Sequence, residues 1–166
     1  MKNVIIFLLI VFVSFNTHCQ TEKKFNYANP FDENSYIVTL KNEKPISKCA
    51  KQVIGRFLDE QNVSDMIYSI VEKSISTEKK QNLTGRGGLV DIRFSSTGRV
   101  LCIIMYIDKD NLEILNESDL YTLYSNLHKF EMDMSKIDLE YPDNWVQGTE
   151  AYWRFNFPLK KRDRPQ

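Results

Sequence analysis

The sequence predicts an α+β fold in which two to three helices pack on one face of a small antiparallel sheet. Three observations support it: an alternating hairpin pattern over residues 87–108, helical spacing of apolar residues before and after it, and an alternating aromatic segment near the C-terminus. The 166 residues suffice for one domain. We expect that domain at 45–160, after a signal peptide at 1–19 and an extended lead-in with one short strand at 20–44, and before a basic tail at 161–166.

The hairpin is the clearest of these signals. Val90, Ile92 and Phe94 alternate with polar residues, which is the period of a strand with one wet face. Gly98 closes the turn, because glycine adopts the positive φ that a tight reversal needs. The second strand, at 99–107, is apolar at almost every position, so we expect it at the centre of the sheet with both faces covered.

The other elements follow from local spacing. Pro45 and apolar residues spaced i, i+3, i+4 and i+7 predict a first helix at 45–61. Trp153, Phe155 and Phe157 share one side of the last predicted strand, which gives that strand an aromatic inner face. The remaining predictions, in chain order, are a short strand at 36–41, helices capped by Ser64 and by Ser118, a weak strand at 132–139 and the last strand at 151–159.

The N-terminus has the three regions of a secretory signal: Lys2, an apolar run at 4–13, and Thr17-His18-Cys19 before a cleavage point at Gln20. The apolar run is too short to span a bilayer comfortably, and no other segment is long and apolar enough. We therefore expect an exported protein, periplasmic or extracellular, with no transmembrane span in its mature chain. Cys19 leaves a second route open, in which cleavage before this cysteine gives a lipid-anchored lipoprotein.

Charge content bears on the class of partner, and cysteine content on the possibility of a disulfide. The chain has 22 basic and 22 acidic residues, and its lysines are spread among acids, which argues against nucleic acid as the partner. After signal cleavage the cysteines are Cys49 and Cys102, both expected to point inward. In an oxidising compartment they would form a disulfide, whereas buried free thiols are the alternative.

Few residues suggest catalysis. His128 is the one histidine outside the predicted signal, so we expect neither a metal site nor a cofactor. A nucleophile pair would need His128 beside Cys49, Cys102 or a serine, and both cysteines are predicted to be buried. The acids at 131–140 alternate with apolar residues, as solvated side chains on a strand do. We therefore favour a non-enzymatic protein and leave the question of catalysis open.

The second half of the chain resembles the C-terminal domain of TonB-type energy transducers and their secreted relatives. The matching pieces are Val90-Asp91-Ile92-Arg93-Phe94, Thr97-Gly98-Arg99-Val100, the helix from Ser118, and Trp153-Arg154-Phe155-Asn156-Phe157-Pro158. The chain lacks the long proline-rich spacer of a transducer, so we do not expect energy transduction. The resemblance implies an envelope protein of the kind found in Bacteroidetes-like organisms.

Together these features predict an exported, non-enzymatic interaction module of the cell envelope, with an envelope protein as its partner. The candidate surface is a sheet edge at Tyr152, Arg154 and Asn156, where a partner's backbone would add a strand. The alternative is a small-ligand-binding or catalytic domain with a pocket between sheet and helices. Tyr124 and His128 are then the inward polar candidates.

Overall fold

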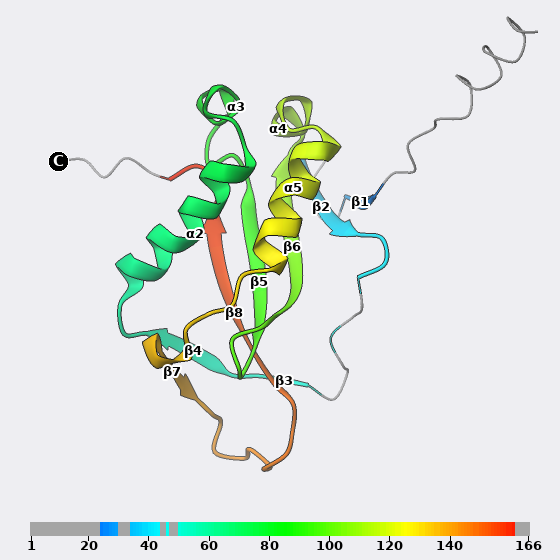
Figure 1. Ribbon diagram of the computed structural model, residues 1–166. Helices are drawn as coiled ribbons and strands as arrows, with labels where there is room; N and C mark the ends of the chain where they lie inside the picture. The colour runs from blue at the N-terminus through cyan, green and yellow to red at the C-terminus, as the bar shows by residue number, and fades with distance from the viewer. Residues whose placement is uncertain (1–23, 30–33, 44–45, 47–49, 162–166) are drawn as a thin grey trace, which may run out of the picture.

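The computed structural model describes residues 24–29, 34–43, 46 and 50–161. These residues form an α+β fold in which the helices lie on one face of a six-stranded sheet (Figure 1). All neighbouring strands are antiparallel except β3 and β8, which run parallel. The strands, in the order in which they pair, are β1 (Phe25–Ala28), β2 (Ser35–Leu40), β6 (Val100–Asp108), β5 (Leu89–Ser95), β8 (Ala151–Pro158) and β3 (Lys51–Gln52).

The predicted hairpin is confirmed. Strands β5 and β6 pair antiparallel at the centre of the sheet, with Ile92 opposite Ile103. Gly98 has a φ of 85° in the turn between them, and a Cβ at this position would lie 2.2 Å from the carbonyl oxygen of Met132. Only glycine fits both the backbone angle and the close approach.

The expectation that both faces of β6 are covered is wrong. Its inward residues, including Ile103, Met105 and Ile107, are fully buried beneath the helices. Its outward residues, such as Ile104 and Tyr106, are only half-buried, because the described helices lie on one face alone (Figure 1). The apolar composition of β6 therefore reflects its central position in the sheet, and no second layer covers it.

Two helices form the layer above the sheet. α2 (Glu60–Ser74) and α5 (Glu117–His128) lie side by side, and α5 also contacts β6 (Figure 1). Both helices were predicted, but each begins earlier than expected. Asp59 caps α2 in place of Ser64, and Asn116 caps α5 through a capping box with Asp119 in place of Ser118.

Two shorter helices lie at one end of this layer (Figure 1): α3 (Thr77–Asn82) and α4 (Lys109–Ile114), neither of which was predicted. Asn111 of α4 is fully buried, and its side chain bonds both the N–H and the carbonyl of Thr84. Asn111 thereby fastens the loop after α3 to the start of α4. The expected lead-in also contains a strand that was not predicted, β1, beside the predicted β2.

The predicted helix at 45–61 is wrong. Most of its described residues form β3, which pairs with β8, and β4 (Ile54–Phe57), which pairs with β7 (Ile137–Glu140) in a separate two-stranded sheet, and α2 begins only at Glu60. Ile54 is 57% exposed, although the helical pattern assigned it to a buried face. Long-range strand pairing therefore overrides the local apolar spacing in this segment.

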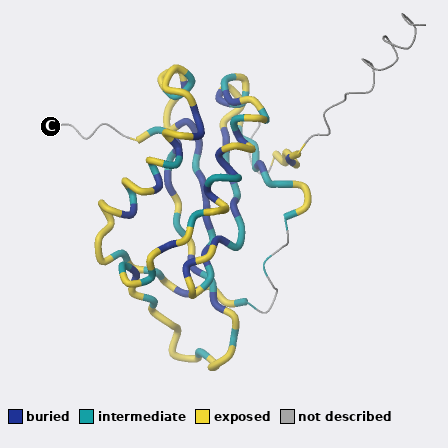
Figure 2. Tube along the Cα trace, in the orientation of Figure 1, coloured by how far each residue is buried: buried dark blue, intermediate teal, exposed yellow. Residues whose placement is uncertain are grey.

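An aromatic cluster fills the core where β4 passes β8. Trp153 is fully buried and stacks on Phe94, with ring centroids 4.6 Å apart. Phe57 packs edge-on against both Trp153 and Phe155. The aromatic inner face predicted for the last strand is confirmed, and the buried residues follow the strands and the inner sides of the helices (Figure 2).

Candidate functional site

The last strand has one side that is only partly paired. β5 pairs with β8 along its whole length, from Pro158 opposite Leu89 to Tyr152 opposite Ser95. On the other side, β3 pairs with Ala151 and Tyr152 alone, and the last hydrogen bond runs from the N–H of Val53 to the carbonyl of Tyr152, 2.8 Å. Beyond this bond no strand among the described residues pairs with that edge of β8.

The three residues predicted for this edge differ in their pairing. In a strand, alternate residues direct their main-chain groups to the same side. Since the carbonyl of Tyr152 faces β3, the N–H and C=O groups of Arg154 and Asn156 face the same edge after β3 has left it. Both residues are exposed, whereas Tyr152 is half-buried. Arg154 and Asn156 therefore form an open edge, while β3 already occupies the edge at Tyr152.

The side chain of Arg154 is fixed on the outer face of the sheet. Its Nη2 lies 2.6 Å from Oδ2 of Asp91 and its Nε lies 3.3 Å from Oδ1, which makes a bidentate pair. The hydrogen bond to Asp91 raises the pKa of Arg154. Arg93 approaches the same carboxylate from β5, with Nε at 3.8 Å from Oδ2.

Asp91 is fully buried by this arrangement, although the alternating pattern of β5 predicted a solvent-facing position. The alternation itself is correct, because Asp91 does lie on the outer face. The guanidinium that covers it belongs to a residue 63 positions away in the chain, so no local sequence signal could have identified this ion pair.

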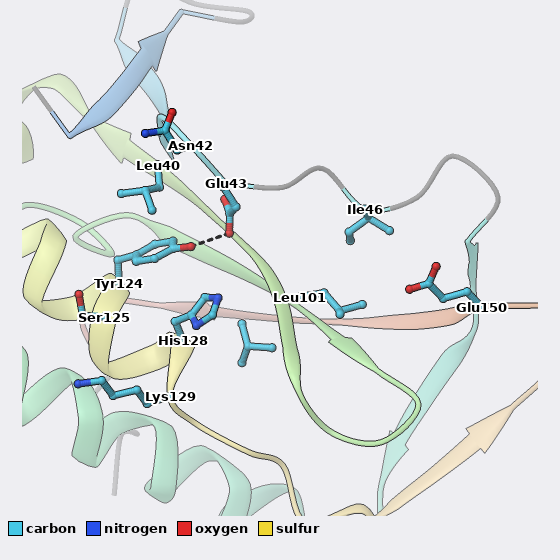
Figure 3. Close-up of a pocket in the computed structure, with 11 residues that line it drawn as sticks. Leu40, Asn42, Glu43, Ile46, Leu101, Tyr124, Ser125, His128, Lys129 and Glu150 are labelled. Atoms are coloured by element: carbon cyan, nitrogen blue, oxygen red, sulfur yellow. Dashed lines mark hydrogen bonds between the residues drawn. The ribbon is translucent and has the colours of Figure 1, made fainter.

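A pocket of about 630 Å³ lies between α5 and the edge of β6 (Figure 3). Leu40 and Glu43 approach it from the end of β2, Val100 and Leu101 from β6, and Tyr124 and His128 from α5. The pocket therefore brings together the two polar residues that the alternative prediction singled out.

Glu43 is the central polar group of this pocket. Its Oε1 accepts one hydrogen bond from the hydroxyl of Tyr124, 2.9 Å (Figure 3), and another from the N–H of Ile103, 3.0 Å. Burial, and then the hydrogen bond to Glu43, raise the pKa of Tyr124, so this phenol remains a hydrogen-bond donor. Glu43 was not predicted, because it stands in a short polar segment with no motif around it.

His128 lines the pocket but is exposed. Its ring stacks on that of Tyr124, with centroids 5.7 Å apart and planes inclined by 29°. The stack forms one wall of the pocket on the side of α5.

Of the two cysteines predicted to pair, only Cys102 lies within the described residues. Cys102 carries a free thiol, is half-buried, and lies opposite Arg93 on the outer face, so the expectation that it points inward is wrong. Burial, followed by the charge of Glu43, raises its pKa to about 12. Cys49 and the lipidation candidate Cys19 lie outside the described residues, and the disulfide stays a prediction.

The described residues contain no group of three or more His, Cys, Asp or Glu side chains that could hold a metal ion. Within the same ranges, no helix has the length and apolarity needed to cross a membrane.

The structure is that of an α+β protein in which two strands are only partly paired on one side. β2 covers only part of β6, and β3 covers only the start of β8. The chain matches no protein-family model and no curated protein. It is similar to the crystal structure of a DUF5043 family protein from Bacteroides uniformis, with 9% sequence identity and a TM-score of 0.46 over 87% of this chain and 92% of that chain. A likeness at this level carries no argument about function.

Proposed function

We propose that this protein is an exported, non-enzymatic interaction module that binds an extended segment of an envelope protein along the open edge of β8. One observation carries the proposal: pairing on this edge stops at Tyr152, whereas β8 continues to Pro158. The N–H and C=O groups of Arg154 and Asn156 are therefore directed where an added strand would receive them.

The ion pair with Asp91 keeps this edge accessible. A charged side chain on an edge strand commonly protects it from pairing with another chain. Here the guanidinium of Arg154 is held on the outer face by Asp91, so its charge is engaged within the sheet. The main chain of Arg154 is left uncovered at the edge, which favours recognition through backbone hydrogen bonds.

The state of Cys102 supports a binding role over nucleophilic catalysis. A reactive cysteine needs a lowered pKa, because the thiolate is the nucleophile. The pKa of Cys102 is raised to about 12, which keeps the thiol protonated at physiological pH.

Site-specific photo-cross-linking in the native host tests the proposed surface. A photoreactive amino acid at Asn156 is expected to yield a discrete adduct with one envelope protein. The same residue at Asn26, an exposed asparagine on the opposite edge strand β1, is expected to yield none. Adducts of equal yield from both positions, or from Asn26 alone, would contradict binding at β8.

The variant Asn156→Pro provides the matched functional test. Proline removes one N–H from the open edge and none from the β5–β8 pairing. We expect the partner identified through the Asn156 adduct to no longer co-purify with this variant, while the thermal midpoint stays within a few degrees. Continued co-purification with the folded variant would argue against strand addition.

We propose export together with this function. The first residue of the mature chain distinguishes ordinary signal cleavage from lipoprotein processing. Cell fractionation and mass spectrometry are expected to give a periplasmic or extracellular chain that begins at Gln20. A lipid-modified Cys19 at the N-terminus would establish the lipoprotein route instead, and an uncleaved cytoplasmic chain would contradict export.

A further inference from the structure

The pocket beside α5 lies where the pairing of β2 with β6 stops, so that the first residues of β6 have no partner strand on this side among the described residues. The pairing of β2 with β6 runs from Ser35 opposite Asp108 to Val38 opposite Met105. Two residues nearer the start of β6, the N–H of Ile103 donates to the side chain of Glu43, 3.0 Å away. A carboxylate thus takes the place of a strand carbonyl at this edge, and it places a negative charge at the side of the pocket.

That charge has no cationic partner within the described part of the chain. Both donors to Oε1, the N–H of Ile103 and the hydroxyl of Tyr124, are neutral, and no described Lys, Arg or His lies within ion-pair distance of Glu43. Glu43 is half-buried. A carboxylate withdrawn from water is stabilised strongly by an opposite charge, so its environment favours a cation as ligand.

The other lining groups include two basic residues, His128 and Lys129, but also a second acid and apolar side chains that suit an organic cation. Glu150 adds a second carboxylate, and the amine of Lys129 is directed away from Glu43 in Figure 3. Leu40, Val100 and Leu101 provide apolar surface. The volume of about 630 Å³ lies within the range of small-molecule sites, roughly 300–1,000 Å³.

We infer that this pocket binds an organic cation, a protonated primary amine carried on an apolar body. The ammonium group donates to the carboxylate of Glu43, which the hydroxyl of Tyr124 holds in place. The apolar body contacts Leu40, Val100 and Leu101. This site is separate from the open edge of β8 and does not depend on strand addition there.

A charge series on the unaltered protein tests the inference directly. The probes are 2-phenylethylamine, which is protonated at pH 7, its neutral analogue 2-phenylethanol, and the anion 3-phenylpropionate. Titrations followed by the amide NMR signal of Ile103 report the site, because this N–H is bonded to Glu43. We expect the amine to bind at least about tenfold more tightly than the alcohol. An alcohol that binds equally well, or an anion that binds better, would overturn the inference.

The variant Glu43→Gln separates charge from hydrogen bonding. Glutamine keeps an acceptor oxygen for Ile103 and Tyr124 while removing the negative charge. We expect it to reduce amine affinity about tenfold and leave alcohol binding unchanged. The matched control is Glu113→Gln, which makes the same change of net charge at an exposed position on α4. Equal losses in both variants would assign the effect to overall charge and overturn the site. If Glu43→Gln does not fold, the charge series alone decides.

Discussion

Arg154 covers a fully buried carboxylate on the face of the sheet that carries no described helix. Its Nη2 lies 2.6 Å from Oδ2 of Asp91, and the arginine side chain is 36% exposed while the aspartate side chain is 0% exposed. The register pairs Asp91 with Asn156 and Arg93 with Arg154, so the ion pair runs diagonally between β5 and β8. It therefore links the two strands on the outer face independently of the aromatic core.

Loss of Arg154 should cost more stability than loss of the charge on Asp91. Arg154→Met leaves a buried carboxylate with only Arg93 near it, whereas Asp91→Asn releases a guanidinium that reaches water. We expect Arg154→Met to lower the free energy of unfolding by roughly 2–4 kcal/mol, below the full value for a buried pair because the arginine is partly exposed. Asp91→Asn should cost about 1 kcal/mol. Urea denaturation measures both.

The double variant provides the control for this pair. Because the two side chains are in direct contact, the effects should not add, and Asp91→Asn with Arg154→Met should be less destabilising than the sum of the single changes. Additive effects would mean that the ion pair contributes no coupling to stability.

Proline substitutions should distinguish the two edges of β8. The N–H of Phe155 faces β5, because Phe155 pairs with Ile92 and the main-chain groups alternate along the strand. Phe155→Pro should therefore destabilise the protein by about 1–3 kcal/mol more than Phe155→Ala, which removes the ring and keeps the N–H. Asn156→Pro should cost less than about 1 kcal/mol. Thermal and urea unfolding of the three variants would check this, and a large loss from Asn156→Pro would show that its N–H is paired.

Gly98 and Gly148 allow the steric cost of adding a Cβ to be separated from the cost of a positive φ. Both have positive φ, 85° and 89°, but a Cβ at Gly98 would meet the carbonyl oxygen of Met132 at 2.2 Å, whereas nothing lies within 4 Å at Gly148. Gly148→Ala should cost about 1 kcal/mol from backbone strain alone. Gly98→Ala should cost at least about 3 kcal/mol, because the hairpin turn must move as well. Equal losses of unfolding free energy would contradict the steric account.

Cys102 should resist alkylation in the folded protein. Its pKa rises from the ordinary 9.0 to about 12, chiefly through burial and next through Glu43. This lowers the thiolate fraction at pH 8 by about a thousandfold. Iodoacetamide labelling, resolved by peptide mass spectrometry, should be at least about a hundredfold slower at Cys102 in the native chain than in urea. Comparable rates would contradict the raised pKa, and Glu43→Gln should speed the native reaction.

The same shift predicts the sign of a pH dependence. Between pH 9 and about 12 the unfolded chain releases the thiol proton while the folded chain retains it. The free energy of unfolding should therefore fall as pH rises through this range. Cys102→Ser should remove this part of the dependence, and an unchanged slope in that variant would assign the dependence to other groups.

Local sequence patterns predicted correctly those elements whose structure depends on the residues of the element itself. The hairpin of β5 and β6, the apolar side of α5 and the aromatic face of β8 each follow a period set within the element. The helix predicted at 45–61 was wrong for the opposite reason. Strands β3 and β4 of this segment pair with β8 and β7, which lie far away in the chain, and this pairing overrides the helical spacing of the apolar residues.

Both candidate sites were likewise decided by tertiary structure. The sequence marked Arg154 and Asn156 as outward residues of a last strand, but the point at which β3 leaves β8 determines how much of that edge is open. The sequence predicted Tyr124 and His128 as inward polar residues, of which His128 is exposed beside the pocket. The role of Glu43 depends on where the pairing of β2 with β6 ends. Periodicity records which side of an element is apolar. Which strand edges stay unpaired, and which charges meet there, depends on contacts between segments that no local pattern encodes.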